Sequence, residues 1–334
     1  MILIYSNNHD FSTNEVCRIL LKNGTPFIRV NDITFFESLK IDSNGNLPPL
    51  IQYENLNLIE EIHAIWYRRE PENKNLFKNI ALGPLERTLL NHKETELKVI
   101  RNYLNWRLND KFWLNHPSFS SLNKIFVLDI AKKVGLKTAE WVILNNTKDI
   151  IEHLESGRVI TKPLFETIGI ENDSDHFNTR TQEVKREDIQ NIEIGTSFIQ
   201  KMIEKESEIR VVFLEGECFS MEIHSQKNEH TKIDFRNYNI ETPLRFTAFK
   251  LPFSLEKKIE SLMTELKLNF GSLDFILDKN GDFIFLEVNP VGQFGMTSKP
   301  NNYGIEYKIA EILEREEKIA NPKRSEPTSN FSFL

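Results

Sequence analysis

Residues 271–290 constrain the fold more than any other part of the chain, because they have the pattern of a β-hairpin. Two apolar runs are separated by Asn280-Gly281, a strong short-range signal for a two-residue hairpin turn. This turn pairs Lys279 with Asp282, and counting back from it gives the register of the two strands. The apolar pairs predicted in this way are Leu273 with Val288, Phe275 with Leu286, and Leu277 with Ile284. We therefore expect this face of the hairpin to pack into a core.

The opposite face of the hairpin carries two carboxylates. The same register sets Asp274 directly opposite Glu287, with Asn289 one alternation further along the second strand. Residues paired across antiparallel strands lie about 4.5–5.5 Å apart, and like charges placed in this way repel. A cation between the two side chains would remove the repulsion. Because all three side chains offer oxygen, the pattern predicts that they form a Mg²⁺ site.

A Mg²⁺ site of this kind implies a nucleotide. The ion usually takes one or two carboxylates from a protein and completes its coordination with phosphate oxygens and water. The alternative is a solvated acidic strand face followed by an ordinary exit turn. The register places Ile276, Phe283 and Phe285 on the same face as the carboxylates, and these apolar neighbours count against plain solvent exposure.

Several basic residues are candidates for holding phosphates, although each is ambiguous by itself. Lys162 ends a strand-like run and Lys124 lies in the first turn of a predicted helix; taken alone, each is better explained as a surface lysine. Arg210 interrupts the strand-like run 209–213 and faces either solvent or a buried anion. Glu208 shares the strand face of Arg210. The two side chains form either a salt bridge or a pair of contacts to a nucleotide.

The N-terminal third of the chain has the pattern of an α/β domain. An apolar run at residues 2–5 is followed by a helical stretch that ends at Asn23-Gly24, and a second strand follows Pro26. The turn at residues 7–10 contains no glycine, so a dinucleotide site is not expected there. A further apolar run ends in Arg68-Arg69, and a long helical stretch follows. We expect this α/β domain to span residues 1–116.

The rest of the chain has the pattern of two further subdomains, so the expected fold class is α/β (α+β). Residues 117–195 form the first, and within it residues 166–188 are polar and charge-mixed, as expected for an exposed hairpin or loop. Residues 196–319 form the second, which contains several strand-like runs and the acidic hairpin. The polar, proline-containing tail at 320–334 is expected to be disordered.

The composition excludes several classes of protein. A chain of 334 residues with 40% hydrophobic and 27% charged residues can bury a sizeable core. Its net charge of −7 argues against a general nucleic-acid or anionic-membrane partner. The N-terminus lacks a signal-peptide pattern, and no apolar run approaches the ~20 residues of a membrane span. We therefore expect a soluble, cytoplasmic protein.

Taken together and in order, these residues resemble the ATP-grasp superfamily. The resemblance is carried by Lys124, Lys162-Pro163, Gln200-Lys201-Met202-Ile203, Glu208-Ile209-Arg210, Asp234-Phe235-Arg236, Asp274 and Glu287-Val288-Asn289. Within the superfamily the chain is most similar to microviridin-type graspetide macrocyclases, which cross-link ribosomally made peptides. The related branch that adds glutamate to ribosomal protein tails comes next. The match runs from about residue 124 to 289, and the leading α/β unit fits the pre-ATP-grasp domain of the family by pattern.

The resemblance implies a role for each matching residue. Lys124 and Lys162 would contact the ATP phosphates, and Arg210 and Arg236 would lie near the γ-phosphate and perform the catalytic role. The segment Gln200, Lys201, Met202 and Ile203 would line the adenine, and Glu208 would hold the adenine or ribose side. Asp274, Glu287 and Asn289 would bind Mg²⁺. One departure is that the glycine-rich loop that covers the phosphates in many relatives is not evident.

The resemblance also implies a reaction and a partner. A carboxylate side chain of a precursor peptide would be activated by ATP as an acyl phosphate and joined to a Thr or Ser hydroxyl, which gives a macrolactone. A lactam formed with Lys, or ligation of free amino acids as in glutamate ligases, is the alternative. A non-catalytic nucleotide-binding scaffold is a third hypothesis, and the retained carboxylates argue against it. A homodimer is expected by resemblance.

The polar stretch 166–188 is the candidate site for the leader part of such a peptide. In the enzymes that the chain resembles, a leader helix docks on a hairpin in this region. The acidic residues Glu171, Asp173 and Asp175 would then contact the leader. A variable surface loop is the equally weighted alternative.

Overall fold

The structure is a computed structural model that describes residues 1–43, 48–73, 83–165, 169–171, 176–178, 181–189, 194–226, 231–237 and 243–320. The chain divides into two compact units. The first consists of Met1–Pro117 together with the chain from Gly304 onward, and the second is Ser118–Tyr303. Within the described residues, no helix combines the length and the apolar character needed to cross a lipid bilayer.

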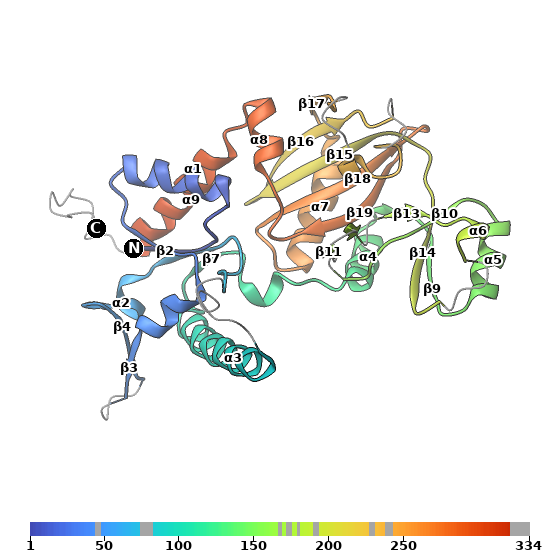
Figure 1. The fold of residues 1–334 in the computed structure, drawn as a ribbon. Coiled ribbons are helices and arrows are strands. Elements are labelled where there is room, and N and C mark those ends of the chain that lie inside the picture. The colour runs from blue at the N-terminus through green and yellow to red at the C-terminus, as the bar shows by residue number, and fades with distance from the viewer. Residues whose placement is uncertain are drawn as a thin grey trace. The chain divides into compact units, whose positions relative to one another are not determined.

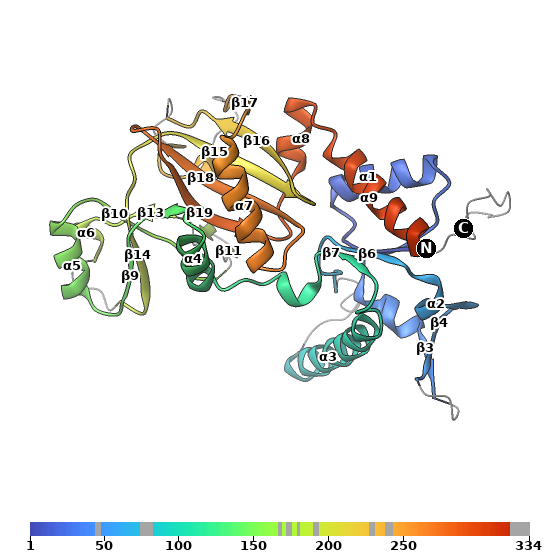
Figure 2. The ribbon, with the colours of Figure 1, turned by 180° about the vertical axis from the view of Figure 1, so that it is seen from behind.

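The first unit is built on a four-stranded parallel sheet with the order β2-β1-β6-β7 (Figure 1). Its strands are β1 (Ile2–Tyr5), β2 (Phe27–Val30), β6 (Ala64–Tyr67) and β7 (Phe112–Leu114). β1 and β6 are buried along their whole length, which explains their uninterrupted apolar sequences. Helices α1 (Phe11–Lys22) and α9 (Ile305–Ala320) pack together, and α9 lies on β1 and β6. Helix α3 (Pro84–Arg107) lies on the other side of the sheet (Figure 2).

A smaller antiparallel sheet completes the first unit. It consists of β3 (Lys40–Asp42), β4 (Leu50–Tyr53) and β5 (Leu56–Asn57), followed by the short helix α2 (Leu58–Glu61). A 3-10 helix, η1 (Ile33–Ser38), follows β2 and packs against α3.

Helix α9 belongs to the first unit, whereas the division expected from the sequence assigns residues 305–319 to the C-terminal subdomain. Three polar contacts accompany its packing. The amino group of Met1 pairs with Glu317 Oε1 at 2.9 Å, and both groups are buried. Asn23 and Thr25 donate hydrogen bonds to Glu314 Oε1 at 3.0 and 2.8 Å. The chain therefore returns to its N-terminal sheet, which a linear division along the sequence does not anticipate.

The second unit contains a mixed sheet of six strands, an antiparallel sheet of four strands and the two-stranded sheet β11-β12. The larger has the order β17-β16-β15-β18-β19-β8 and the smaller β13-β10-β14-β9. The strands of the larger sheet are β8 (Lys137–Thr138), β15 (Lys205–Leu214), β16 (Glu217–Ile223), β17 (Phe246–Phe249), β18 (Phe270–Asp278) and β19 (Phe283–Asn289). Those of the smaller sheet are β9 (Trp141–Leu144), β10 (Val159–Thr161), β13 (Gln182–Glu183) and β14 (Ser197–Lys201).

Helices cover one face of each sheet. On the larger sheet, α4 (Lys124–Lys133) and α7 (Phe253–Glu265) pack against β18 and β19 in the main core, which includes Leu128, Ile259 and Phe275. On the smaller sheet, α5 (Thr147–Glu155) and α6 (Arg186–Ile189) bury Ile150 and Ile189. The other elements are η3 (Pro117–Phe119), β11 (Gly169–Glu171), β12 (His176–Asn178), η5 (Phe235–Asn237) and α8 (Gly295–Asn301).

The β18–β19 hairpin has a different turn from the predicted one. Its turn contains three residues, Lys279 to Gly281, and is closed by a hydrogen bond from Asp278 N–H to Asp282 O at 3.0 Å. Gly281 has a left-handed φ of +84°, as a three-residue hairpin loop requires. The two-residue turn is therefore wrong, and the pairs next to it shift by one residue. Phe275 lies opposite Phe285, and Leu277 lies opposite Phe283.

A β-bulge at Leu286 then restores the predicted register. Beyond the bulge, Asp274 pairs with Glu287, Leu273 with Val288 and Ser272 with Asn289, as predicted. The bulge also exchanges the faces of the residues before it, because a one-residue shift turns side chains to the other side of a sheet. Phe283 and Phe285 consequently pack in the main core rather than beside the carboxylates.

Candidate functional site

The site centres on the carboxylates of Asp274 and Glu287, which neighbouring strands place side by side. β15 sets Arg210 directly opposite Asp274 on the other flank of β18. The guanidinium meets that carboxylate at two points, with Nε 3.0 Å from Oδ1 and Nη2 3.2 Å from Oδ2. Burial raises the pKa of Asp274 and Glu287 adds to the rise, while Arg210 opposes it. A further cation near this pair would favour the charged form of Asp274.

Arg210 faces an anion, which was one of the two alternatives for an arginine within a strand. Its side chain is 13% exposed. Its Nη1 lies 2.7 Å from the sulfur of Met296, and its guanidinium lies 5.8 Å from the centre of the Phe235 ring. These contacts come from three separate elements, so the orientation of the guanidinium is fixed before any ligand binds.

Two lysines approach Glu287 from the N-terminal part of the second unit. Lys124, the first residue of α4, has its Nζ 3.9 Å from Glu287 Oε2 and donates to the carbonyl oxygens of Pro163 and Phe165 at 2.8 and 3.1 Å. Lys162 follows β10 in the smaller sheet. Burial lowers the pKa of Lys162, and the charge of Glu287 opposes this change. Both lysines therefore lie within the electrostatic field of the carboxylate pair.

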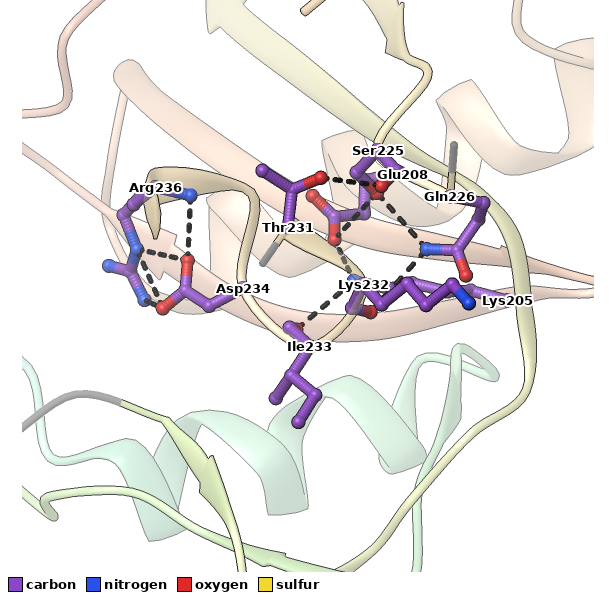
Figure 3. A network of polar contacts seen from close by, with 9 residues as sticks. All are labelled: Lys205, Glu208, Ser225, Gln226, Thr231, Lys232, Ile233, Asp234 and Arg236. Carbon is purple, nitrogen blue, oxygen red and sulfur yellow. Dashed lines mark hydrogen bonds and ion pairs between the residues drawn. The ribbon is translucent and has the colours of Figure 1, made fainter. Parts of the chain in front are cut away.

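Arg236 reaches the site from the segment that follows β16 (Figure 3). Asp234 holds its guanidinium, with Arg236 Nε 2.8 Å from Oδ1 and Nη2 2.8 Å from Oδ2. Burial alone would raise the pKa of Asp234, but the hydrogen bonds and charge of Arg236 bring about a net lowering. The hydrogen bonds that Arg236 donates to Asp234 raise the pKa of Arg236, with further contributions from Glu287 and Asp274. Arg236 therefore remains a cation beside the carboxylate pair.

The site as a whole carries more cations than its two central carboxylates can neutralise. Those cations are Lys124, Lys162, Arg210 and Arg236. Such an arrangement suits a ligand that brings several negative charges, and a polyphosphate is the common biological example. The sequence analysis proposed each of these residues, and the structure places all four near the carboxylate pair.

The oxygen ligands present fit a magnesium ion that is shared with phosphates. Asn289 accepts a hydrogen bond from the N–H of Val291 at 3.0 Å through its side-chain oxygen, which fixes the direction of the amide. No group of three or more His, Cys, Asp or Glu side chains in the described part of the chain is arranged to hold a metal. Two carboxylates and one amide would leave the remaining coordination positions to phosphate oxygens and water, as is usual for Mg²⁺.

An apolar cluster lies on the same face as the carboxylates. Ile276 is two residues from Asp274 on β18, and it packs with Ala139 and Ile284. Ile203 and Leu286, both partly buried, pack against the cluster. Of these residues the sequence predicted Ile203 as part of an adenine-lining segment. It missed Ala139, and it assigned Ile284 and Leu286 to the core because it did not include the bulge.

The segment from Gln200 to Ile203 contributes unequally to this region. Gln200 is buried, and its side-chain nitrogen has no hydrogen-bond partner among the described residues. The side chain of Lys201 is exposed and lies 3.8 Å from Glu140. The N–H groups of Lys201 and Met202 already donate within the sheet, so they are not available to a ligand.

Glu208 has a partner that the sequence did not indicate. It forms a buried ion pair with Lys205, whose Nζ also donates to the carbonyl oxygen of Ile233 at 3.1 Å (Figure 3). A register shift in β15 between Lys205 and Ser207 lies between the two residues of this ion pair in the sequence. Burial raises the pKa of Glu208 to about 7 despite the attraction of Lys205. The salt bridge to Arg210 that the sequence left open is not formed.

The acidic residues proposed to contact a leader peptide are largely outside the described part of the chain. Asp173 and Asp175 lie outside the described residues. Glu171 is the last residue of β11, which pairs with β12 in an antiparallel hairpin. The structure therefore shows a hairpin within the predicted stretch, and leader binding there stays a prediction.

Comparison with solved structures identifies the fold. The chain is similar to a RiPP-associated ATP-grasp ligase from Chryseobacterium gregarium in complex with ADP and a leader and core peptide, with a TM-score of 0.75 and 25% identity over 94% of this chain and 96% of that one. It is also similar to the macrocyclase MdnC from Microcystis aeruginosa bound with its precursor peptide MdnA, with a TM-score of 0.76 and 25% identity over 94% and 99%.

A more distant likeness extends to other ATP-grasp enzymes. The D-alanine–D-alanine ligase of Bacillus anthracis matches with a TM-score of 0.52 and 14% identity over 96% of this chain and 99% of that one. No protein-family model matches the chain, and no curated protein matches it. The chain has the fold of the ATP-grasp ligases, and the resemblance expected from its sequence, to these enzymes and among them to the peptide macrocyclases, is confirmed.

Proposed function

We propose that the protein is an ADP-forming ATP-grasp ligase that cyclises a ribosomally made precursor peptide by joining Asp or Glu side chains to Thr or Ser hydroxyls. The observation that carries the proposal is the pair Asp274 and Glu287. Neighbouring strands hold the two carboxylates on one face of the larger sheet, and four cations surround them. Similarity to two peptide-modifying ATP-grasp enzymes over almost the whole chain supports the substrate class.

The residues of the site divide the work of binding ATP. Lys124 and Lys162 neutralise the phosphates, and Arg210 and Arg236 orient and stabilise the transferring γ-phosphoryl group. Asp274, Glu287 and Asn289 would hold Mg²⁺, which would supply positive charge that offsets the charge of the phosphates. Catalysis of this kind depends on positioned charge, and the contacts of Arg210 with Asp274 and Met296 supply that positioning.

The adenine end of the nucleotide would lie toward the apolar cluster around Ile276. This cluster includes Ile203 and shares a strand face with Asp274, so it offers apolar surface beside the phosphate-binding charges. The unpartnered amide of Gln200 supplies a polar group in the same segment. Glu208 belongs to the polar network with Lys205, which supports a place near the nucleoside rather than the phosphates. Contacts of Lys201 and Met202 with the base would involve atoms other than their N–H groups.

The reaction has two steps. An Asp or Glu carboxylate of the peptide attacks the γ-phosphorus of ATP, which forms an acyl phosphate and releases ADP. A Thr or Ser hydroxyl of the same peptide then attacks the acyl carbon, loses its proton and displaces phosphate, which leaves an ester. If a Lys amine attacks instead, the product is an amide. The cytoplasm, which supplies ATP and Mg²⁺, would be the site of the reaction.

Other parts of the proposal concern the peptide and the assembly. The β11–β12 hairpin, with Glu171 at the end of its first strand and Asp173 and Asp175 following in the sequence, would hold the leader. The smaller sheet takes β9, β10 and β13 from residues 117–195 and β14 from the following subdomain. The larger sheet takes β8 from residues 117–195 and its other strands from residues 196–303, and the two sheets together would form the nucleotide site. We also propose a homodimer, which sedimentation velocity measurements would test.

The deciding experiment measures ADP release with ATP and Mg²⁺ in three parallel reactions. One contains no peptide, one a mixture of free amino acids, and one the precursor peptide encoded beside the gene, with mass spectrometry of each product. Peptide-dependent ADP release with the loss of one water per ring would support the macrocyclase. Turnover with free amino acids would move the enzyme to the small-ligase class, and the absence of turnover in all three would contradict the proposal.

A further inference from the structure

The first unit has its own concentration of polar residues, at the carboxyl edge of its parallel sheet. All four strands of this sheet run in the same direction, so the residues that follow them share one edge. These residues are Ser6 and Asn7 after β1, Asn31 after β2, Arg68 and Arg69 after β6, and Asn115 after β7. Open α/β sheets bind their ligands at this edge. The site described above uses no residue of this group.

One buried carboxylate organises the edge. Asp10 is the N-cap of α1 and accepts from the N–H of Thr13 at 2.8 Å through Oδ1. Its other oxygen, Oδ2, meets Arg68 Nη2 at 3.0 Å and Arg69 Nε at 2.7 Å. Burial alone would raise the pKa of Asp10, but the charge of Arg68 and the hydrogen bonds from Arg69 and Thr13 bring about a net lowering. Asp10 therefore stays ionised between two guanidinium groups.

The two arginines differ in their access to solvent. The side chain of Arg68 is 2% exposed, whereas that of Arg69 is 30% exposed. Arg69 uses Nε for Asp10, and within the described residues its Nη1 and Nη2 have no hydrogen-bond partner. A guanidinium held at Nε presents these two nitrogens as a fork, which matches the two oxygens of a carboxylate.

Acidic neighbours within the described residues do not satisfy this fork. Glu70 is paired with Arg101 and accepts a hydrogen bond from the hydroxyl of Tyr67 at 2.7 Å. Asp32, which follows β2, caps its own 3-10 helix by accepting from Thr34. Two arginines therefore contact the same oxygen of Asp10, at the positive end of a helix, and the fork of Arg69 has no partner among the described residues.

An aromatic residue beside the cluster indicates what kind of anion it binds. Phe11 directly follows Asp10 and is 77% exposed. An exposed aromatic residue that directly follows the carboxylate holding Arg69 suits an acidic side chain carried on a peptide better than a free phosphate. The four cations proposed to bind the phosphates all belong to the second unit, whereas Arg69 belongs to the first.

We propose that Arg69, held in place by Asp10 and Arg68, binds an Asp or Glu side chain of the peptide substrate at this edge. The inference rests on the proposed function for the identity of the peptide and adds a recognition site for its carboxylate. Arg69 is a binding residue, and Asp10 and Arg68 position it.

The test is a binding cycle with two peptides and two forms of the enzyme. The peptides are the precursor encoded beside the gene and its counterpart with every core Asp and Glu changed to Asn and Gln. Affinities are measured by calorimetry in the presence of ADP and Mg²⁺, which prevents turnover. We expect Arg69→Gln to weaken binding of the acidic peptide by about tenfold and binding of the amide peptide by less than twofold. ADP affinity should not change.

Matched variants separate recognition from folding. Arg18→Gln removes a surface arginine that is paired with Glu15 on the same unit, and it should leave both peptide affinities unchanged. Arg69→Lys keeps the charge but not the fork, so it should retain part of the preference for the acidic peptide. If the wild-type enzyme binds both peptides with equal affinity, the proposal that Arg69 binds a peptide carboxylate is wrong. The same conclusion follows if Arg69→Gln loses the same affinity for both peptides.

Those outcomes are distinguishable from failure of the proposed function. If the enzyme prefers the acidic peptide through Arg69 but releases no ADP with it, the proposed macrocyclase function is wrong and the binding role of Arg69 stands. An enzyme that cyclises the peptide while Arg69→Gln shows no selective loss would retain the macrocyclase and contradict the site.

Discussion

Both units pair arginines with aspartate, but in opposite proportions. In the second unit, Arg210 contacts Asp274, and Glu287 lies next to Asp274 on the neighbouring strand. Two carboxylates are therefore concentrated on one face of the sheet. In the first unit, a single carboxylate, Asp10, is shared by Arg68 and Arg69. The same residue types therefore form two different arrangements: the second unit sets two carboxylates side by side among several cations, whereas the first unit sets one carboxylate between two arginines.

The largest effect is expected from a substitution in the carboxylate pair. Glu287→Gln should reduce peptide-dependent ADP release by about a thousandfold, because it removes a charged Mg²⁺ ligand and transition-state stabilisation of several kcal/mol. The same change removes a like-charge repulsion, so the melting temperature without ligands should not fall. Steady-state kinetics over a range of Mg²⁺ concentrations and thermal unfolding measure the two effects. Unchanged turnover would contradict the metal role, and Glu260→Gln on the exposed face of α7 is the control.

The buried arginine of the first unit should matter for stability more than for catalysis. Arg68→Gln leaves Asp10 with one guanidinium in a buried setting, and breaking such a pair costs about 3 kcal/mol of unfolding free energy. Arg69→Gln, at a more exposed site, should cost less than about 1 kcal/mol. Urea denaturation of both variants measures the two losses of unfolding free energy. Equal losses would mean that the two arginines do not have distinct roles in the fold.

The Glu208–Lys205 pair predicts a pH dependence. The folded pKa of Glu208 is raised to about 7 from the ordinary value of 4.5, so the fold favours the protonated form. Its contribution to stability is present below about pH 4.5 and is lost as the pH rises through about 7, by at most about 3 kcal/mol. Glu208→Gln does not titrate, so its stability relative to wild type should increase from pH 5 to pH 8. A constant difference across that range would contradict the raised pKa.

The smallest effect is expected at Lys201. Its side chain is exposed and lies beside Glu140, and it makes no contact with the carboxylate pair among the described residues. Lys201→Gln should change ATP affinity by less than twofold and unfolding free energy by less than about 0.5 kcal/mol. A larger loss of nucleotide affinity would show that this side chain reaches the ligand. Lys162→Gln, which removes a buried cation of the site, provides the contrast.

The sequence predicted the pairing of Asp274 with Glu287 because the signal for it is local. Asp274 and Glu287 are paired as expected, since strand alternation and a recognisable turn place them in one register. This success contains two errors that cancel, because the longer turn and the bulge at Leu286 each shift the register by one residue. Residues between turn and bulge reveal the errors: Phe283 and Phe285 lie in the core, whereas the predicted register faced them toward the carboxylates.

Features that depend on distant parts of the chain were missed. Nothing near Glu314 or Glu317 indicates that α9 packs on the N-terminal sheet, because the partners of these residues lie at the other end of the sequence. The role of Lys205 depends on a register shift in β15, which hydrophobic periodicity does not encode. The contact of Arg69 with Asp10 likewise depends on residues from two distant parts of the sequence.

The bulge at Leu286 has a consequence for engineering the protein. It lies between the turn and the carboxylates, and beyond it the partners of β18 on both flanks fix the register. A change in loop length at Asn280-Gly281 would therefore be absorbed before it reaches Asp274. This exposed loop is accordingly a suitable place to insert a fluorescent reporter, which would follow the binding of nucleotide at the far end of the same two strands without altering the groups that bind it.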